Sequence, residues 1–258
     1  MKIAILTLGC KVNKYESDAL MYNLNLKGLH AHIGSQIFEL QSFTDEVKIL
    51  VKELVNINEK FGLNLDELNI GGGLGVKYID TDLPPTIEAL ADAIGNAMDE
   101  YAQKLTIYLE PGRSIISTAG VTLYKVGSSK QVPNGRKYVA IDGGMADNPR
   151  PSMYQAIYSA ELAGDLRTEI EKVTISGRFC ESGDILIEEI ELPKLEPNDV
   201  LCVYNTGAYN YSMASNYNRV EKPAMVLVNS AQSDIIVNRE SLEDLIVREV
   251  VPNRLRRK

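Results

Sequence analysis

The sequence predicts an α/β fold joined to a β-domain: a partial (β/α)8 barrel followed by an antiparallel β-sandwich or barrel. Residues 26–118 alternate short apolar segments with amphipathic helical segments, which is typical of right-handed parallel βαβ units. From about residue 119 the helical period fades, and short β-branched segments follow one another with turn residues between them. Even with the start of the chain, the first part holds four predicted strands at most. A closed barrel needs twice that number, so the barrel is expected to be open or incomplete.

The first part contains three predicted strands separated by two predicted helices. The strands are expected over residues 26–33, 67–73 and 105–112. The first helix covers residues 44–62, with Thr44 as its N-cap and Gly62 as its stop. The second covers residues 84–103 and opens with two prolines, which suit the first turn of a helix. Both helices carry apolar residues at i, i+3, i+4 and i+7 spacing, so each should pack one face on a sheet.

The second part is predicted to be mainly β. Its strands are expected over residues 120–128, 137–144, 172–177, 184–192, 199–205, 222–229 and 233–238. A short helix is predicted over residues 150–160 and a terminal helix over residues 241–251. The first 25 residues add a strand over residues 2–8 and a helix over residues 14–24. The predicted domains are therefore residues 1–25, 26–118 and 119–258.

Composition restricts the class of protein. The net charge is −8 and the pI is near 5.0, which argues against binding nucleic acid through a basic face. No apolar run reaches the length of a membrane helix, and no secretion signal is recognisable. The three cysteines are too few and too scattered for a disulfide framework or a CxxC metal site. We therefore expect a cytoplasmic protein that contacts neither membrane nor nucleic acid and holds no metal.

Candidate functional residues follow all three strands of the first part. Such strand ends carry the functional residues of parallel sheets. His32 could stack on a cofactor ring, or it could be a histidine that simply bonds the backbone. Ser35 and the glycine run Gly71–Gly75 could hold a phosphate, although glycines also make tight turns. Glu110 and Arg113 share one turn, where they could bind a cofactor or pair with each other.

Further candidates lie in the second part. Cys180 and Glu181 belong to a short loop between two strands, where an exposed thiol could donate a proton. A free cysteine is more often a small buried apolar residue, and this is the expectation for Cys202. Arg150 offers a planar fork suited to a carboxylate. The tyrosine-rich run of residues 207–218 could line a small-molecule pocket or form a polar surface loop.

Six runs together resemble the diaminopimelate decarboxylases, which are fold-type III pyridoxal-phosphate enzymes like ornithine and arginine decarboxylases. In the family's order they are AHIGSQ, NIGGGLG, EPGRS, IDGGMADNPRPSMY, GRFCESGD and GAYNYSMASNYN, and the resemblance covers residues 26–251. It implies a pyridoxal-phosphate-binding, alanine-racemase-like barrel, a β-domain and a homodimer with shared active sites. It also implies an amino-acid decarboxylase of lysine biosynthesis that converts meso-diaminopimelate to L-lysine and CO2.

The resemblance also implies residue roles. Pyridoxal phosphate would be bound by His32, Ser35, Gly72, Gly73, Glu110, Gly112, Arg113 and Tyr209. The substrate would contact Arg113, Arg150, Tyr154, Glu181 and Tyr209. Cys180 and His32 would be the catalytic residues, Cys180 as a proton donor and His32 stacked on the cofactor ring. Arg150 favours a substrate with a distal carboxylate, hence meso-diaminopimelate over ornithine.

One family feature is missing from the sequence. The Schiff-base lysine of these enzymes lies in a run resembling YAVKAN, and no such run occurs here. Two alternatives follow. Either another chain or an unrecognised lysine, such as Lys11 or Lys14, completes the site, or the chain is a non-catalytic fragment that associates with an intact decarboxylase.

The opening MKIAILTLGCKVNKYESDAL is similar to the N-terminus of radical-SAM methylthiotransferases. In that family the cysteine of a GCxxN motif, here Cys10, helps to bind an iron–sulfur cluster. A cluster needs about four protein ligands, mainly cysteine, and this chain has three scattered cysteines. We therefore expect no cluster, and a methylthiotransferase-related role is a third alternative.

Overall fold

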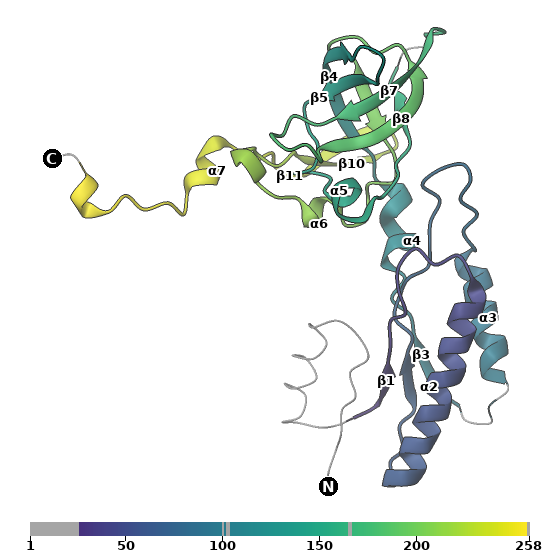
Figure 1. The fold of residues 1–258 in the computed structure, drawn as a ribbon. Helices are drawn as coiled ribbons and strands as arrows, with labels where there is room; N and C mark the ends of the chain where they lie inside the picture. The colour runs from purple at the N-terminus through teal and green to yellow at the C-terminus, as the bar shows by residue number, and fades with distance from the viewer. Residues whose placement is uncertain (1–25, 100, 102–103, 165–166, 257–258) are drawn as a thin grey trace. The chain divides into compact units, whose positions relative to one another are not determined.

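The computed structural model describes residues 26–256, except residues 100, 102–103 and 165–166. The chain divides into two compact units, residues 1–117 and residues 118–258 (Figure 1). The predicted strand and helix of residues 1–25 lie outside the described residues. Within the described part, no helix combines the length and apolar character that a bilayer span requires.

The first unit contains a three-stranded parallel sheet. Its elements are β1 (Gly28–His30), α2 (Leu40–Phe61), β2 (Glu67–Asn69), α3 (Ile87–Asp99), β3 (Thr106–Tyr108) and α4 (Gly112–Ile116), with η1 (Ser117–Ala119) at the end of the unit. The strand order is β1-β2-β3, and Leu29, Leu68 and Ile107 lie side by side in register. The alternation of strands and helices that the sequence predicts is confirmed, and both connections between these strands are helical crossovers.

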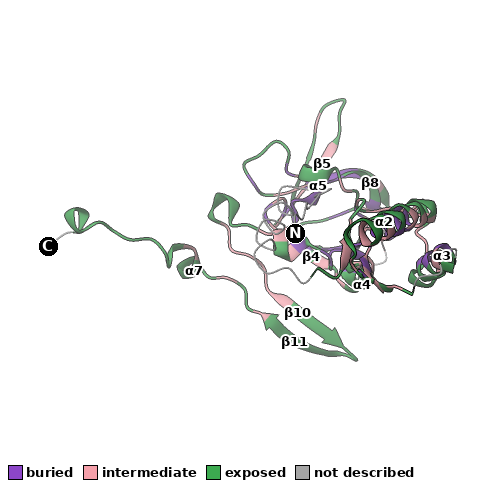
Figure 2. Cartoon of the chain, turned by 90° about the horizontal axis from the view of Figure 1, so that it is seen from below, coloured by how far each residue is buried: buried purple, intermediate pink, exposed green. Residues whose placement is uncertain are grey.

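The core of the first unit lies between the sheet and its two long helices. Its buried members are Phe43, Val47, Leu50, Val51, Leu68, Ile70, Leu74, Leu90, Ile94 and Ala97. Four of them, Phe43, Val47, Leu50 and Val51, belong to α2, which carries buried segments in purple in Figure 2. The predicted N-cap Thr44 is wrong, because α2 begins at Leu40 and the Thr44 hydroxyl donates to the Gln41 carbonyl inside the first turn. Gly62 does end the helix, in the left-handed conformation with φ 65°.

The second unit is built on a six-stranded sheet. Its strands are β4 (Thr122–Gln131), β5 (Lys137–Ile141), β6 (Ala160–Leu162), β7 (Ile170–Ser176), β8 (Ile185–Pro193) and β9 (Val200–Val203). The order is β6-β9-β4-β5-β7-β8. All neighbours are antiparallel except β5 and β7, which pair in parallel, so the predicted antiparallel sheet is right for most of its strands.

Short helices interrupt the second unit. They are α5 (Arg150–Tyr154), α6 (Asn210–Met213), η2 (Tyr217–Arg219), α7 (Leu242–Ile246) and η3 (Asn253–Leu255). The helices predicted over residues 150–160 and 241–251 are each reduced to five residues. In α7 a capping box between Ser241 and Asp244 fixes the start of the helix.

A separate hairpin follows the six-stranded sheet. Strands β10 (Met225–Asn229) and β11 (Gln232–Val237) pair with each other in antiparallel fashion, and they form a two-stranded sheet of their own. Within the described residues from Met225 to Arg256, no side chain is buried (Figure 2). An isolated two-stranded hairpin is only marginally stable in water. We therefore expect the β10–β11 hairpin to be stabilised by packing against another surface.

Candidate cofactor and substrate site

Side chains from all three strand ends of the first unit meet around the glycine run. His32 follows β1, and its Nδ1 accepts a hydrogen bond of 3.1 Å from the Gly72 amide after β2. Because Nδ1 is an acceptor, the neutral ring carries its proton on Nε2. The ring is exposed, so one face is open to a ligand. The Gly72 amide is already used in this contact.

Glu110 is held at the end of β3 by a residue that sequence reasoning did not identify. The side-chain Nδ2 of Asn69 donates to Glu110 Oε1 at 2.7 Å, and its Oδ1 accepts from the Gly71 backbone amide at 2.8 Å. Asn69 therefore fixes the carboxylate relative to the glycine run. Glu110 is exposed, so a protonated ring nitrogen could bind its other carboxylate oxygen.

Arg113 is the centre of a buried polar network. Its guanidinium donates to the Tyr78 hydroxyl at 2.7 Å and to Ser35 Oγ at 2.8 Å, and only 6% of its surface is exposed. The Ser117 hydroxyl also donates to the Tyr78 hydroxyl, at 3.3 Å. Because Ser35 Oγ accepts from Arg113, its own hydrogen is left to donate elsewhere. An anion beside Ser35 would receive that hydrogen bond next to a fixed positive charge.

Glycine is required where the strand-end loops approach each other. A Cβ on Gly72 would lie 2.1 Å from the Glu110 carbonyl oxygen, and one on Gly73 would lie 2.5 Å from the Gly34 carbonyl oxygen. Gly73 has φ 109°, which side chains rarely allow. The Gly112 amide donates to the Glu110 carbonyl at 2.7 Å, so that amide supports the turn before Arg113. The backbone of Gly72 and Gly73 thus carries no side chain that would fill the space beside it.

Three loops of the second unit are tied together by hydrogen bonds. The Ser215 amide donates to the Ala146 carbonyl at 2.8 Å, the Cys180 amide donates to Asn218 Oδ1 at 3.0 Å, and the Ser152 hydroxyl donates to the Gly183 carbonyl at 2.8 Å. These bonds join residues 143–154, 177–184 and 207–218. The three motifs that the sequence singled out in this part therefore gather in one place.

Arg150 lies between two aromatic rings within this group of loops. Its guanidinium carbon is 5.5 Å from the Tyr154 ring centre and 5.7 Å from the Tyr209 ring centre. Both tyrosines are exposed, whereas Arg150 is 8% exposed. Aromatic contacts of this kind orient a guanidinium and leave its fork for a carboxylate.

The two described cysteines differ as the sequence predicts. Cys180 is exposed on the loop beside Glu181, which is also exposed. Cys202 is buried in β9, and burial raises the pKa of its thiol. Of these two thiols, that of Cys180 is therefore the one accessible for proton transfer.

Part of the chain matches a known family model. Residues 7–117 match the model described as "Pyridoxal-dependent decarboxylase, pyridoxal binding domain". A diaminopimelate decarboxylase of Synechocystis sp. is 48% identical over 239 residues, which cover 90% of this chain and 51% of that protein. The Bacillus subtilis diaminopimelate decarboxylase is 43% identical, with 87% of this chain and 52% of that protein covered.

A solved structure supports the same relationship. The M. jannaschii diaminopimelate decarboxylase in complex with L-lysine has a TM-score of 0.86 and 38% identity, and the match covers 95% of this chain and 56% of that one. Over most of its length the chain is therefore similar to pyridoxal-dependent decarboxylases. It spans about half the length of the curated relatives it matches. The family match begins at residue 7, inside the segment that the sequence analysis set apart as residues 1–25.

The residues around the first-unit site fit the cofactor of this decarboxylase family. The Ser35–Arg113 pair offers a hydroxyl hydrogen and a cation to a phosphate. The exposed His32 and Glu110 follow β1 and β3, the two strands that flank β2. At Gly73 the backbone lies close to the Gly34 carbonyl, in a space that a Cβ would fill. Sequence reasoning missed Asn69 and Tyr78, although Asn69 stands just ahead of the NIGGGLG glycines.

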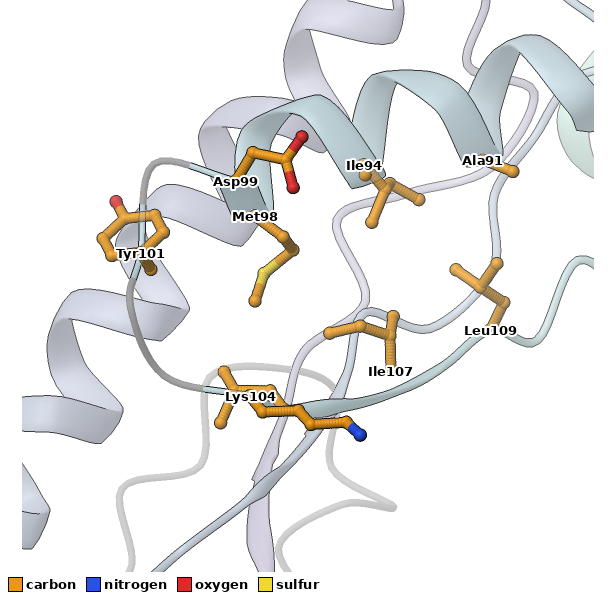
Figure 3. Close-up of a pocket in the computed structure, with 10 residues that line it drawn as sticks. Ala91, Ile94, Met98, Asp99, Tyr101, Lys104, Ile107 and Leu109 are labelled. Atoms are coloured by element: carbon orange, nitrogen blue, oxygen red, sulfur yellow. The ribbon is translucent and has the colours of Figure 1, made fainter.

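A groove in the first unit lies away from these residues. A space of about 560 Å³ separates α3 from the end of β3, and it is lined mainly by apolar residues that include Ala91, Ile94, Met98, Ile107 and Leu109 (Figure 3). None of the residues assigned to the decarboxylase site lines it. Its volume therefore gives no argument about the cofactor.

No metal site is found in the described part of the chain, where no group of three or more potential ligands comes together. Cys10, Lys11 and Lys14 lie outside the described residues.

Proposed function

We propose that the chain binds pyridoxal phosphate and meso-diaminopimelate as part of a diaminopimelate decarboxylase that produces L-lysine and CO2. The observation that carries the proposal is the Ser35–Arg113–Tyr78 network, placed with His32 and Glu110 around the glycine run. The relatives' names support the reaction, and the L-lysine complex of the M. jannaschii relative supports the product class.

In this proposal the first unit holds the cofactor. Ser35, Gly73 and Arg113 would bind its phosphate, with Gly72 and Gly112 shaping the adjoining turns. His32 would stack on the ring and Glu110 would bind the ring nitrogen. When bound, pyridoxal phosphate supplies an electron sink for the loss of CO2. Glu110 supports that chemistry by keeping a positive charge on the ring nitrogen favourable.

The second unit would handle the substrate. Arg150 would bind the distal carboxylate through its fork, and Tyr154 and Tyr209 hold that fork in place. Tyr209 would also touch the cofactor, Arg113 would contact the substrate beside the phosphate, and Glu181 would bind a substrate amine. Cys180 would deliver the proton that replaces the lost carboxylate.

Assembly and location belong to the same proposal. Two copies would share active sites, with Cys180 and Glu181 serving the partner's site. A cytoplasmic location fits a step of amino-acid biosynthesis. Sedimentation of the purified chain with and without pyridoxal phosphate tests the dimer, and a monomer under both conditions would contradict it.

Covalent trapping tests catalysis by the chain itself. Pyridoxal phosphate is added, the mixture is reduced with borohydride, and peptides are mapped by mass spectrometry. A labelled lysine would identify the residue that replaces the family's YAVKAN lysine. With no labelled lysine, independent catalysis is excluded.

Non-covalent binding is measured separately by equilibrium dialysis. Ser35→Ala and Arg113→Ala should each weaken pyridoxal-phosphate binding by about tenfold or more. Ser114→Ala is a matched control in the same turn, because its hydroxyl donates only to the Pro111 carbonyl in the described structure. Equal affinity for all four proteins would contradict the assigned phosphate site.

A second function, association with an intact decarboxylase, is favoured by the β10–β11 hairpin. Its apolar side chains are exposed, with Val228 at 69% and Ile235 at 65%. Capture of the full-length Bacillus subtilis relative by the immobilised chain tests this function. No association at micromolar concentration would remove it.

The similarity of the first residues to methylthiotransferases supports a third, separate function. Iron content after anaerobic reconstitution tests it, with Cys10→Ser as the control. We expect no iron above background, because the sequence lacks the further cluster cysteines.

A further inference from the structure

Asp184 ends the loop that carries Cys180 and Glu181, and its side chain points back into the unit. Only 4% of the residue is exposed. Its Oδ1 accepts from the Met145 amide at 2.7 Å, and its Oδ2 accepts from the Phe179 amide at 2.8 Å. One carboxylate thus bonds the loop of Cys180 and also the loop that leads to Arg150.

Two glycines leave the space that this carboxylate occupies. A Cβ on Gly177 would lie 2.1 Å from Asp184 Oδ2, and a Cβ on Gly144 would lie 2.4 Å from Asp184 Oδ1. Gly177 does not have a positive φ, so its backbone alone would accept a side chain. The glycine at position 177 is therefore explained by the carboxylate beside it rather than by a turn.

Backbone bonds close the same junction. The Gly177 amide donates to the Asp184 carbonyl at 2.9 Å, the Arg178 amide donates to the Gly143 carbonyl at 3.0 Å, and the Asp184 amide donates to the Glu181 carbonyl at 3.1 Å. The exposed thiol and carboxylate of Cys180 and Glu181 are thus carried on a turn whose two ends are fixed. Burial raises the pKa of the Asp184 carboxyl, and the two amide bonds oppose that change.

We propose that Asp184 is a positioning residue that locks the Cys180–Glu181 turn onto the loop leading to Arg150. It acts through these residues and touches no substrate. The contribution of Asp184 to catalysis rests on the proposed decarboxylase function. Its hydrogen bonds between the two loops do not depend on that function. The lock keeps the proton donor and the carboxylate-binding arginine in one fixed relation within the chain.

The lock is tested without cofactor. Hydrogen exchange is compared in the full chain, in Asp184→Ala and in Asp142→Asn. Asp142 is the control, because its carboxylate accepts the backbone amide of Lys125, whereas the amides of Met145 and Phe179 donate to Asp184. The amides of Met145 and Phe179 should exchange about tenfold faster or more in Asp184→Ala and at the original rate in Asp142→Asn. Unchanged protection of both amides in Asp184→Ala would overturn the proposal.

A second experiment separates positioning from mere packing. In the original chain, Gly177→Ala should lower the melting temperature. In the Asp184→Ala background, Gly177→Ala should raise the melting temperature, because the new methyl group fills the vacated space. Alkylation of Cys180 by iodoacetamide is followed in the same variants in a Cys10→Ser background. Asp184→Ala should alkylate Cys180 faster than the original chain, because its turn is no longer held. The double variant should melt near the original temperature yet keep this faster rate. If the double variant restores the slow rate as well, Asp184 only fills space and the proposal fails.

These outcomes are distinct from failure of the proposed function. A lock that survives both tests while no pyridoxal phosphate binds would remove the decarboxylase assignment alone. Cofactor binding with unchanged exchange and alkylation would remove the lock alone.

Discussion

Glu46 is a buried carboxyl on α2 with no hydrogen-bond partner within the described structure. Burial raises its pKa from the ordinary 4.5 to about 7. The folded state therefore holds the proton more tightly than the unfolded state. The stability that this proton contributes is fully present below pH 4.5 and is lost as the pH rises through about 7.

Glu46→Gln should consequently stabilise the chain at pH 8 by about 2 to 3 kcal/mol and have little effect at pH 4. Urea unfolding at both pH values measures the difference. Glu53→Gln, at an exposed position of the same helix, is the control and should change little at either pH. Equal stabilisation by both variants would contradict the buried charge as the cause.

Tyr78 gives a prediction for the phosphate site. Tyr78→Phe removes the hydroxyl that accepts from Arg113 and Ser117. The arginine then loses one of its anchors, so pyridoxal phosphate should bind about tenfold more weakly. Pyridoxal, which lacks the phosphate, should be affected much less. Titration with both compounds checks this prediction. An equal loss of affinity for both would contradict a role of Tyr78 in binding the phosphate.

At the level of single elements, two helical glycines should respond in opposite directions to alanine. Gly62→Ala should destabilise the first unit by about 1 kcal/mol, because Gly62 ends α2 at φ 65°. Gly95→Ala in the middle of α3 should stabilise it by about 0.5 to 1 kcal/mol, because a Cβ there meets nothing within 4 Å. Thermal unfolding of the two variants checks both signs. Stabilisation by Gly62→Ala would contradict the helix-end argument, and destabilisation by Gly95→Ala would contradict the argument from open space at α3.

The elements also mark how far sequence reasoning reaches. Apolar periodicity along α2 predicted correctly that Val47, Leu50, Val51 and Leu54 are buried, since that pattern is local. Phe61, predicted on the same face, is 48% exposed at the end of the helix. The start of α2 was misplaced by four residues, because Thr44 resembles an N-cap but lies inside the first turns. Strand β6 was missed, since three residues carry no measurable pattern.

The candidate site divides in the same way. Motif residues such as His32 and Arg113 can be named from the sequence because they stand at the ends of predictable strands. Asn69 and Tyr78 cannot, because Asn69 bonds Glu110, 41 positions away, and Tyr78 bonds Arg113, 35 positions away. Only the fold brings such pairs together.

At the level of the whole molecule, the C-terminal hairpin decides whether the chain is self-sufficient. The hairpin pairs only with itself in the described structure, and Val226, Val228 and Ile235 are largely exposed. An apolar ribbon of this kind gains free energy by burying its faces against another polypeptide. We expect the chain to associate with itself or with a partner rather than remain a monomer.

The paired substitution Val226→Thr and Val228→Thr should reduce that association. Threonine keeps a β-branched side chain, so the hairpin's preference for strand is retained while its apolar area falls. Sedimentation across a range of concentrations should show the original chain as larger than a monomer and the variant shifted toward the monomer. Ile49→Thr, at an exposed position of α2, removes apolar surface outside the hairpin and should leave association unchanged. If Ile49→Thr has the same effect, general loss of surface hydrophobicity, and not the hairpin, governs association.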